Sequence, residues 1–221
     1  MHTTPNIIAD LIADLCGSDE SLRIQASFAL GVLGEPAVAP LTQLLETPSS
    51  ELRKRAAWVL GVIGAPALPA LLALAESPDQ TLRIEALRVL GVVGEARALK
   101  QLLVGLTDPD PRVAARAARA IGKLGDPRAY HPLLTALRHP SPDVRYEACR
   151  ALADLHVLDA VPVLREMVTS DTTITTWGAS VAETAGRAAA ELVSGAVTPD
   201  RDEHFARASA ILRQQQQLGP E

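Results

Sequence analysis

The sequence predicts an all-α solenoid of about six antiparallel helix pairs followed by a C-terminal capping helix. Three observations predict this architecture: an internal repeat, a helical spacing of apolar residues inside each copy, and a composition that suits closely packed helices. Of the 221 residues, 48% are hydrophobic but only 3% are aromatic. Ala, Leu and Val must therefore fill the core, which favours small-residue helices over a β-sandwich.

The internal repeat consists of five copies of one segment, such as LRIEALRVLGVVG. Successive copies start 30, 30, 31 and 31 residues apart, a nearly constant spacing. The copies begin at Leu22, Leu52, Leu82, Val113 and Val144. A repeated unit of this length cannot bury its apolar face alone, so neighbouring units are expected to stack.

Apolar residues occupy the first, fifth, ninth and twelfth positions of every copy. At 100° per residue these positions span about 80° of a helix surface, so each copy is predicted to be an amphipathic helix. The residues are Leu22, Ala26, Leu30 and Leu33; Leu52, Ala56, Leu60 and Ile63; Leu82, Ala86, Leu90 and Val93; Val113, Ala117, Ile121 and Leu124; Val144, Ala148, Leu152 and Leu155.

Another helix is predicted between successive copies. These helices are expected at residues 36–46, 66–76, 96–106, 127–137 and 158–168. Glycines that tolerate positive φ are expected to end the repeated helices, at Gly34, Gly64, Gly94 and Gly125. Prolines mark the turns inside the pairs, at Pro48, Pro78, Pro109 and Pro140.

The two ends of the chain depart from the repeat, as capping units do. Residues 5–16 are predicted to form the first helix, and residues 172–194 a longer last helix. Residues 199–217 have the pattern of a polar amphipathic capping helix, with an apolar side made of Phe205, Ala208 and Leu212. We therefore expect a solenoid domain over residues 1–195, and a capping helix with a frayed tail over residues 196–221.

The consensus of the copies is D-P-x-x-(V/L)-R-x-x-A-x-x-A-L-G-x-L-G-D-P-x-A, and it resembles the HEAT repeat in its short bacterial form, the type named for phycobilisome-lyase proteins. The match is best at residues 110–129 (DPRVAARAARAIGKLGDPRA) and extends over about residues 5–170. The resemblance implies an armadillo-type α-solenoid. Most members of this family are scaffolds or adaptors, so a protein or peptide partner is expected. A minority attach bilins to phycobiliproteins, hydroxylate a modified lysine at a di-iron centre, or are DNA glycosylases.

The minority activities can be tested on residues. The di-iron relatives use His-Glu pairs, but Glu follows none of His2, His131, His139, His156 and His204. Trp58 and Trp177 lie too far apart in the repeat to share a glycosylase pocket, and the net charge of −5 disfavours phosphate binding. We expect no catalytic residue, metal or cofactor. A subunit of a bilin lyase is the alternative, because that chemistry leaves no short motif, and a nucleic-acid-binding protein is less favoured.

The cysteines and the N-terminus indicate a compartment. Cys16 and Cys149 lie far apart and make no disulfide framework, which favours a reducing compartment. Cys149 aligns with small or apolar residues of the other copies and is expected to be packed. The N-terminus lacks a basic segment, and no stretch approaches about 18 apolar residues, so neither a secretory signal nor a membrane span is predicted. We expect a cytoplasmic protein.

One flank of the repeated helices changes from apolar to basic along the chain. By resemblance, these helices line the concave surface of the solenoid. The seventh position reads Phe28, Trp58, Arg88, Arg119 and Arg150, while the fourth and eleventh positions add Arg55, Arg116 and Lys123. These eight residues are the predicted partner-binding ladder, for a segment with an apolar end and an acidic end. The alternative is that the two aromatic residues only pack, and that the arginines only keep the surface solvated.

A second arginine column is more regular and is predicted to be structural. It consists of Arg23, Arg53, Arg83 and Arg145, at the second position of their copies. An arginine there can bridge to carbonyls or carboxylates of the neighbouring turn. The fourth copy has Ala114 instead, so either Arg112 or Arg116 compensates or that junction is looser.

Overall fold

A computed structural model describes residues 4–195 of the chain. Within this range the chain forms twelve α-helices and no strand, which confirms the predicted all-α class. The described residues fall into two compact units, residues 4–74 and residues 75–195, and each is considered by itself.

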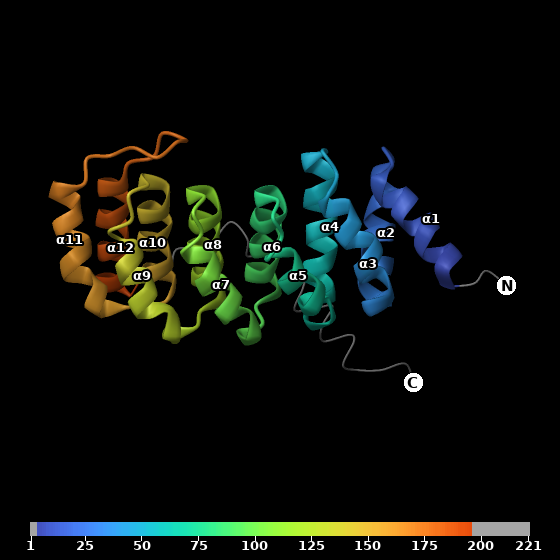
Figure 1. The fold of residues 1–221 in the computed structure, drawn as a ribbon, viewed down its shortest axis with the longest axis horizontal. Coiled ribbons are helices and arrows are strands. Elements are labelled where there is room, and N and C mark those ends of the chain that lie inside the picture. Colours follow the sequence, from blue (N-terminus) through green and yellow to red (C-terminus); the bar gives the residue numbers. More distant parts are fainter. Residues whose placement is uncertain (1–3, 196–221) are drawn as a thin grey trace. The chain divides into compact units, whose positions relative to one another are not determined.

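Unit 1 contains two helix pairs and one further helix (Figure 1). The helices are α1 (Thr4–Cys16), α2 (Glu20–Leu33), α3 (Glu35–Leu45), α4 (Ser50–Ile63) and α5 (Leu68–Leu74). A 3-10 turn, η1 (Ala65–Ala67), leads into α5. The predicted first helix is confirmed as α1. The repeated segments are α2 and α4, which pack against each other and against α1 and α3, respectively.

Unit 2 contains one helix followed by three pairs. The helices are α6 (Gln80–Val93), α7 (Leu99–Leu106), α8 (Pro111–Leu124), α9 (Tyr130–Ala136), α10 (Pro142–Asp154), α11 (Val161–Ser170) and α12 (Val181–Ser194). The 3-10 turns η2 (Ala96–Ala98), η3 (Pro127–Ala129) and η4 (Leu158–Ala160) precede α7, α9 and α11. Helices α6, α8, α10 and α12 lie side by side in one layer, and α7, α9 and α11 form the other (Figure 1).

The ends of the repeated helices follow from the residues next to them. The side chains of Asp19, Ser49, Asp79 and Asp110 accept hydrogen bonds from backbone N–H groups of the first turn. The four predicted glycine C-caps are confirmed: φ is 68° at Gly34, 72° at Gly64, 67° at Gly94 and 68° at Gly125. The fifth copy has His156 at this position, and it adopts the same left-handed region with φ of 53°.

The core follows the predicted period in its central positions. The fifth and ninth positions of all five copies are at most 1% exposed. The prediction is wrong at the first position of the first copy, because Leu22 is 44% exposed in the first turn of α2. Helices also approach each other through small residues. A Cβ added to Gly91 would lie 2.8 Å from Cα of Ala120 on α8.

The segment before α12 differs from the prediction. Residues 172–194 were expected to be helical, but α12 begins only at Val181. Residues 171–180 form a tight loop in which Ile174 and Ser180 make an isolated antiparallel bridge. The cause lies on α10, where the carboxylate of Asp143 accepts hydrogen bonds from the backbone N–H and hydroxyl of Thr176, at 2.8 and 2.7 Å. The side chain of Asp143 thereby holds the loop in place.

The predicted capping helix at residues 199–217 lies outside the described residues. Among residues 4–195, no single helix has the length and apolar character needed to cross a bilayer. Only α4 together with residues 65–74, bent by 116° at their junction, meets that criterion as a pair.

Candidate functional site: an arginine cluster on the second helices

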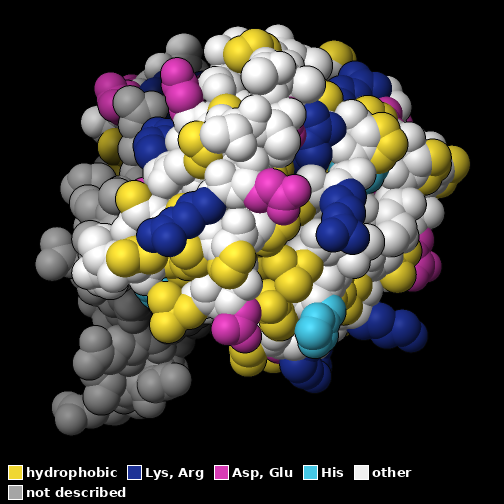
Figure 2. All heavy atoms as spheres, turned by 90° about the vertical axis from the view of Figure 1, so that its left-hand side faces the viewer, with side chains coloured by type: hydrophobic (Ala, Val, Ile, Leu, Met, Phe, Trp, Pro, Cys, Tyr) yellow, Lys and Arg dark blue, Asp and Glu magenta, His cyan; other side chains and the backbone are white. Residues whose placement is uncertain are grey.

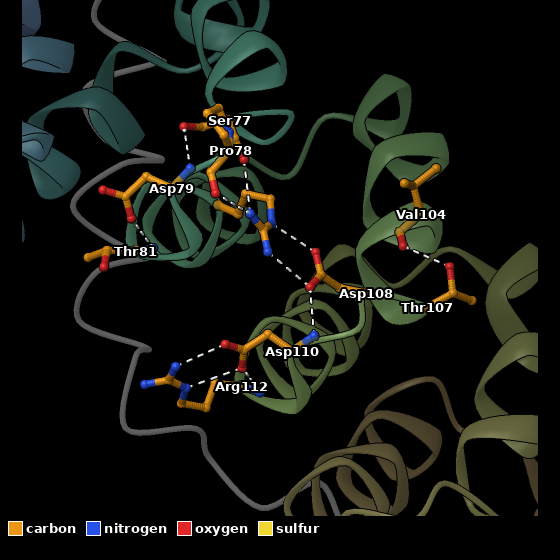
Figure 3. Close-up of polar contacts among 10 residues, drawn as sticks. Ser77, Pro78, Asp79, Thr81, Val104, Thr107, Asp108, Asp110 and Arg112 are labelled. Carbon is orange, nitrogen blue, oxygen red and sulfur yellow. Dashed lines mark hydrogen bonds and ion pairs between the residues drawn. The ribbon is translucent and has the colours of Figure 1, made fainter.

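The arginines of the regular column hold turns together, and Arg83 is the first example. Its Nη1 donates hydrogen bonds to the carbonyl oxygens of Ser77 and Pro78, at 3.0 and 3.1 Å. Its Nε and Nη2 donate to the two carboxylate oxygens of Asp108, at 2.8 and 3.1 Å (Figure 3). This hydrogen bonding, opposed by burial, raises the pKa of Arg83. Arg83 therefore joins the turn before α6 to the turn before α8.

Arg145 repeats this arrangement two copies later. Its Nη1 donates to the carbonyl oxygens of His139 and Pro140, at 2.6 and 2.8 Å. Its Nε and Nη2 donate to the carboxylate of Asp171, at 2.6 and 3.1 Å, and Nη2 also donates to the hydroxyl of Thr173 at 2.7 Å. Arg145 thus joins the turn before α10 to the loop that follows α11.

In unit 1 the corresponding arginines contact the turns before their own helices. Nη1 of Arg53 donates to the carbonyl oxygens of Thr47 and Pro48, at 2.8 and 2.9 Å. Nη1 of Arg23 donates to the carbonyl oxygen of Ser18 at 2.8 Å. All four arginines of the column therefore bind backbone carbonyls at the start of a repeated helix.

The junction that carries Ala114 is closed by packing. Arg112 does not compensate for the missing arginine, because it bonds to the carboxylate of Asp110 in its own turn, at 3.2 and 2.9 Å. The expectation of a looser junction is wrong. A Cβ added to Gly122 on α8 would lie 2.9 Å from Cα of Ala151 on α10, so the two helices are in close contact.

The ladder residues of unit 1 form an aromatic pair and a tied arginine. The rings of Phe28 and Trp58 meet edge to face, with centroids 5.9 Å apart. Phe28 is 42% exposed, so the pair lies partly at the surface. Nη1 of Arg55 donates to the carbonyl oxygens of Leu15 and Gly17, at 3.0 and 3.3 Å, next to the C-terminus of α1. Arg55 is therefore engaged in holding α1 against α4.

The ladder residues of unit 2 gather on three adjacent helices. We call this group the arginine cluster; it comprises Glu85 and Arg88 on α6, Arg116 and Arg119 on α8, and Glu147 and Arg150 on α10. Arg88 is bound to Glu85, with Nε and Nη2 at 2.8 and 2.6 Å from the same carboxylate oxygen. The cluster holds four arginines and two glutamates, an excess of two positive charges. It is a basic patch on a chain whose net charge is −5.

Glu147 carries the counter-charge on α10. Its side chain is 9% exposed, and its oxygens lie 3.9 Å from Nη1 of Arg119 and 3.8 Å from Nη1 of Arg150. These separations exceed hydrogen-bond distance. Burial raises the pKa of Glu147, although Arg119, Arg150 and Arg116 act in the opposite direction. Desolvation therefore outweighs the attraction of three nearby guanidinium groups.

Arg116 lies at the centre of the cluster and is half-buried. Among residues 4–195, no hydrogen bond or ion pair to its side chain is formed. Burial lowers the pKa of Arg116, and the neighbouring charges of Arg119 and Arg88 lower it further. A guanidinium that is partly desolvated beside two others attracts an external anion. This arrangement can bind a carboxylate or a phosphoryl group.

The remaining ladder positions do not share one environment. Lys123 is half-buried near the end of α8. At the same position of other copies, Val32 is 67% exposed whereas Val62 is 1% exposed. The ladder therefore does not form a uniform stripe, and its basic residues are concentrated in the arginine cluster.

A surface that the sequence did not indicate lies beside the loop 171–180. The rings of Trp177 and Tyr146 meet edge to face at 5.4 Å, and Trp177 is 53% exposed. Ile174 of this loop and the exposed side of α12 line a hollow of about 710 Å³, with Glu183 and Arg187 at its wall. Figure 2 shows this end of unit 2, where hydrophobic side chains gather between charged ones. The run of Thr residues before Trp177 was the one available signal of a non-helical segment.

Metal-ligating residues do not converge in the described part of the chain. No group of three or more His, Cys, Asp or Glu side chains there could hold a metal ion. Cys149 is fully buried, and burial raises the pKa of its thiol to about 12. Cys149 is therefore packed, as expected, and is a poor nucleophile at neutral pH.

Comparisons with known proteins address the fold. A family model for HEAT repeats matches residues 8–91, 68–140, 96–181 and 130–211. The complex of CpcE and CpcF of phycocyanin lyase from Nostoc sp. PCC7120 contains a similar chain. The TM-score is 0.61 and the identity 24%, over 69% of this chain and 98% of that chain.

A designed armadillo repeat protein in complex with the peptide (KR)4 is also similar, with a TM-score of 0.49 and 20% identity over 84% of this chain and 98% of that chain. No curated protein sequence matches the chain significantly. At these identities the solved structures support the fold alone.

Proposed function

Because this chain belongs to the HEAT-repeat family, we propose that it is a non-enzymatic interaction module that binds a protein partner through its repeated helices. The proposed contacts are the ladder residues: Arg88, Arg116, Arg119, Arg150 and Lys123 in unit 2, and Phe28, Trp58 and Arg55 in unit 1. An acidic stretch of the partner would bind the arginine cluster. An apolar side chain would contact the aromatic pair.

The half-buried guanidinium of Arg116 is the observation that carries this proposal. A charge taken partly out of water without a bonded partner is unfavourable, and a ligand carboxylate would restore the lost interactions. The arginines that serve the fold differ in this respect. Arg83 and Arg145 each bind two carbonyls and a carboxylate.

A fluorescently labelled octaglutamate peptide tests the acidic contact by fluorescence anisotropy. Replacing Arg116→Ala or Arg119→Glu should weaken binding by about tenfold or more, because each change removes a donor from a desolvated site. Arg97→Glu is the matched control, since Arg97 is 69% exposed on the turn before α7, outside the cluster. Unchanged affinity in both cluster variants would refute the assignment. A short DNA duplex that binds more tightly than the peptide would favour the nucleic-acid alternative.

The aromatic contact has its own readout. The chain has two tryptophans, so Trp177→Phe leaves Trp58 as the single indole fluorophore. A peptide with one leucine beside its glutamates should shift the Trp58 emission to shorter wavelength, because an apolar contact excludes water from the ring. The same peptide with serine in place of leucine should leave the emission unchanged. Identical spectra with both peptides would contradict a role for this pair.

A subunit of a bilin-lyase-type enzyme is the second candidate. Its support is the likeness to a chain of the phycocyanin lyase complex, which covers 98% of that chain at a TM-score of 0.61. Co-expression with a bilin and a phycobiliprotein subunit tests it. A visible absorption band that co-purifies with the phycobiliprotein and depends on this chain would favour the lyase role. Its absence would leave the interaction module.

A further inference from the structure

Glu147 occupies an unusual position inside the arginine cluster. Its side chain is nine-tenths buried, and its Oε2 has no hydrogen-bond partner among the described residues. The guanidinium groups of Arg119 and Arg150 lie 3.9 and 3.8 Å away, close enough for Coulombic attraction but not for hydrogen bonding. The donors of both arginines are therefore not used by Glu147.

The equivalent glutamate on α6 provides the contrast. Glu85 accepts two hydrogen bonds from Arg88, at 2.8 and 2.6 Å, so this pair is closed to an external anion. Around Glu147, by comparison, three guanidinium groups face one carboxylate across longer distances. These groups belong to Arg116, Arg119 and Arg150. Three positive charges against one negative charge leave an excess of two at this position.

On the basis of the proposed function, we propose that Glu147 is an internal competitor that makes the cluster selective for two adjacent negative charges on a polypeptide segment. A ligand with one carboxylate leaves one guanidinium charge unbalanced and also meets the repulsion of Glu147. A ligand with two negative charges balances the excess and can use donors from all three arginines. Two neighbouring acidic residues or one phosphorylated side chain, which carries about two charges at neutral pH, supply this chemistry.

The test uses the full chain and three labelled peptides of equal length. They carry one Glu, two adjacent Glu, or one phosphoserine in an otherwise uncharged sequence. Wild-type protein should bind either dianionic peptide at least about tenfold more tightly than the single-Glu peptide. In Glu147→Gln, affinity for the single-Glu peptide should rise by about tenfold and the selectivity should shrink accordingly. The relative affinities of the two dianionic peptides identify the source of the charge.

The matched control is Glu166→Gln, because Glu166 lies exposed on α11, outside the cluster, and the substitution makes the same change in net charge. It should leave all three affinities unchanged. Circular dichroism verifies the helix content of each variant. Glu147→Met keeps the volume without the charge and serves if the glutamine variant fails to fold.

The outcomes separate this inference from the proposed function. If wild type binds octaglutamate through Arg116 and Arg119, but Glu147→Gln retains the wild-type selectivity, then the role of Glu147 is overturned and the proposed function stands. If neither protein binds any of the acidic peptides, both are overturned. Equal gains in affinity for Glu147→Gln and Glu166→Gln would also overturn the inference, because the effect would then follow from net charge alone.

Discussion

The guanidinium of Arg145 lies flat against the carboxylate of Asp171, with Nε 2.6 Å from Oδ2 and Nη2 3.1 Å from Oδ1. The two side chains are 13% and 11% exposed, so water screens the pair only weakly. Burial by itself would raise the pKa of Asp171, but hydrogen bonds from Arg145 and Thr173 outweigh it and lower the pKa. The ion pair is therefore coupled to the stability of unit 2.

Asp171→Asn should lower the free energy of unfolding by about 1–3 kcal/mol at neutral pH, because it removes charge-assisted hydrogen bonds. A carboxyl group whose pKa is depressed in the folded state stabilises above its ordinary pKa of about 3.9, and this contribution is lost as the pH falls through the folded value. The difference between wild type and variant should therefore shrink between pH 5 and pH 2. Urea denaturation across this range measures it, and a difference independent of pH would contradict the ion pair.

Arg128→Ala provides the comparison for that prediction. Nη2 of Arg128 also lies 2.6 Å from a carboxylate, that of Asp126, but its side chain is 69% exposed. Because solvent screens an exposed pair, this substitution should give no resolvable change in the denaturation midpoint. Equal losses for Arg145→Ala and Arg128→Ala would mean that burial does not decide the strength of these pairs.

Gly122→Ala should destabilise unit 2 by about 1–3 kcal/mol, since overpacking forces neighbouring atoms apart. The added Cβ would lie 2.9 Å from Cα of Ala151 and 2.8 Å from a carboxylate oxygen of Asp154. Gly186→Ala on α12 is the matched control, because the nearest atom, on Val168, is 3.5 Å away. That change should raise stability by up to about 1 kcal/mol through helix propensity. Thermal unfolding of both variants tests the pair of opposite signs.

His156→Gly should stabilise the chain by about 0.5–1 kcal/mol. His156 has φ of 53°, a left-handed conformation that costs a residue with a Cβ about 1–2 kcal/mol, whereas glycine adopts it freely. Part of this gain is offset by the larger entropy of glycine in the unfolded chain. The reverse change at the same position of the preceding copy, Gly125→His, should lower the melting temperature. Opposite shifts in the two variants would show that this estimate of strain is wrong.

The two cysteines should differ in reactivity toward a thiol reagent such as DTNB. Cys16 is exposed, whereas Cys149 is buried and burial raises the pKa of its thiol to about 12. At pH 8 one thiol per chain should react in the native protein, and both should react in denaturant. Cys16→Ser should abolish the native reaction. A native protein in which both thiols react quickly would mean that α10 opens readily.

The repeat made the helices and their caps predictable from sequence. The fifth and ninth positions, such as Ala86 and Leu90, are buried in every copy because the same small and large side chains recur at a helical spacing. The loop 171–180 was not predictable in this way. Its hydrogen-bond acceptor, Asp143, lies 33 residues earlier in the chain, so no local pattern records the contact.

The candidate site shows the same limit in its arginines. Arg55 and Arg116 occupy the same position of two copies, and the sequence treats them alike. Arg55 donates to carbonyl oxygens at the end of α1, while Arg116 lies among other guanidinium groups without a bonded carboxylate. What differs is the neighbouring helix, which presents backbone acceptors in one case and further cations in the other. Periodicity therefore identifies a column, whereas its neighbours decide what each member does.

The bridges made by Arg83 and Arg145 have a consequence for synthesis on the ribosome. Each arginine meets its carboxylate only 25 or 26 residues later in the chain, at Asp108 and Asp171, respectively. Closing a loop of that size costs little more entropy than closing a shorter one. As the nascent chain emerges, each bridge can form once the next turn has been translated, without waiting for the C-terminus. The order of synthesis and the order of assembly can then coincide, because the docking of each pair depends on its immediate successor.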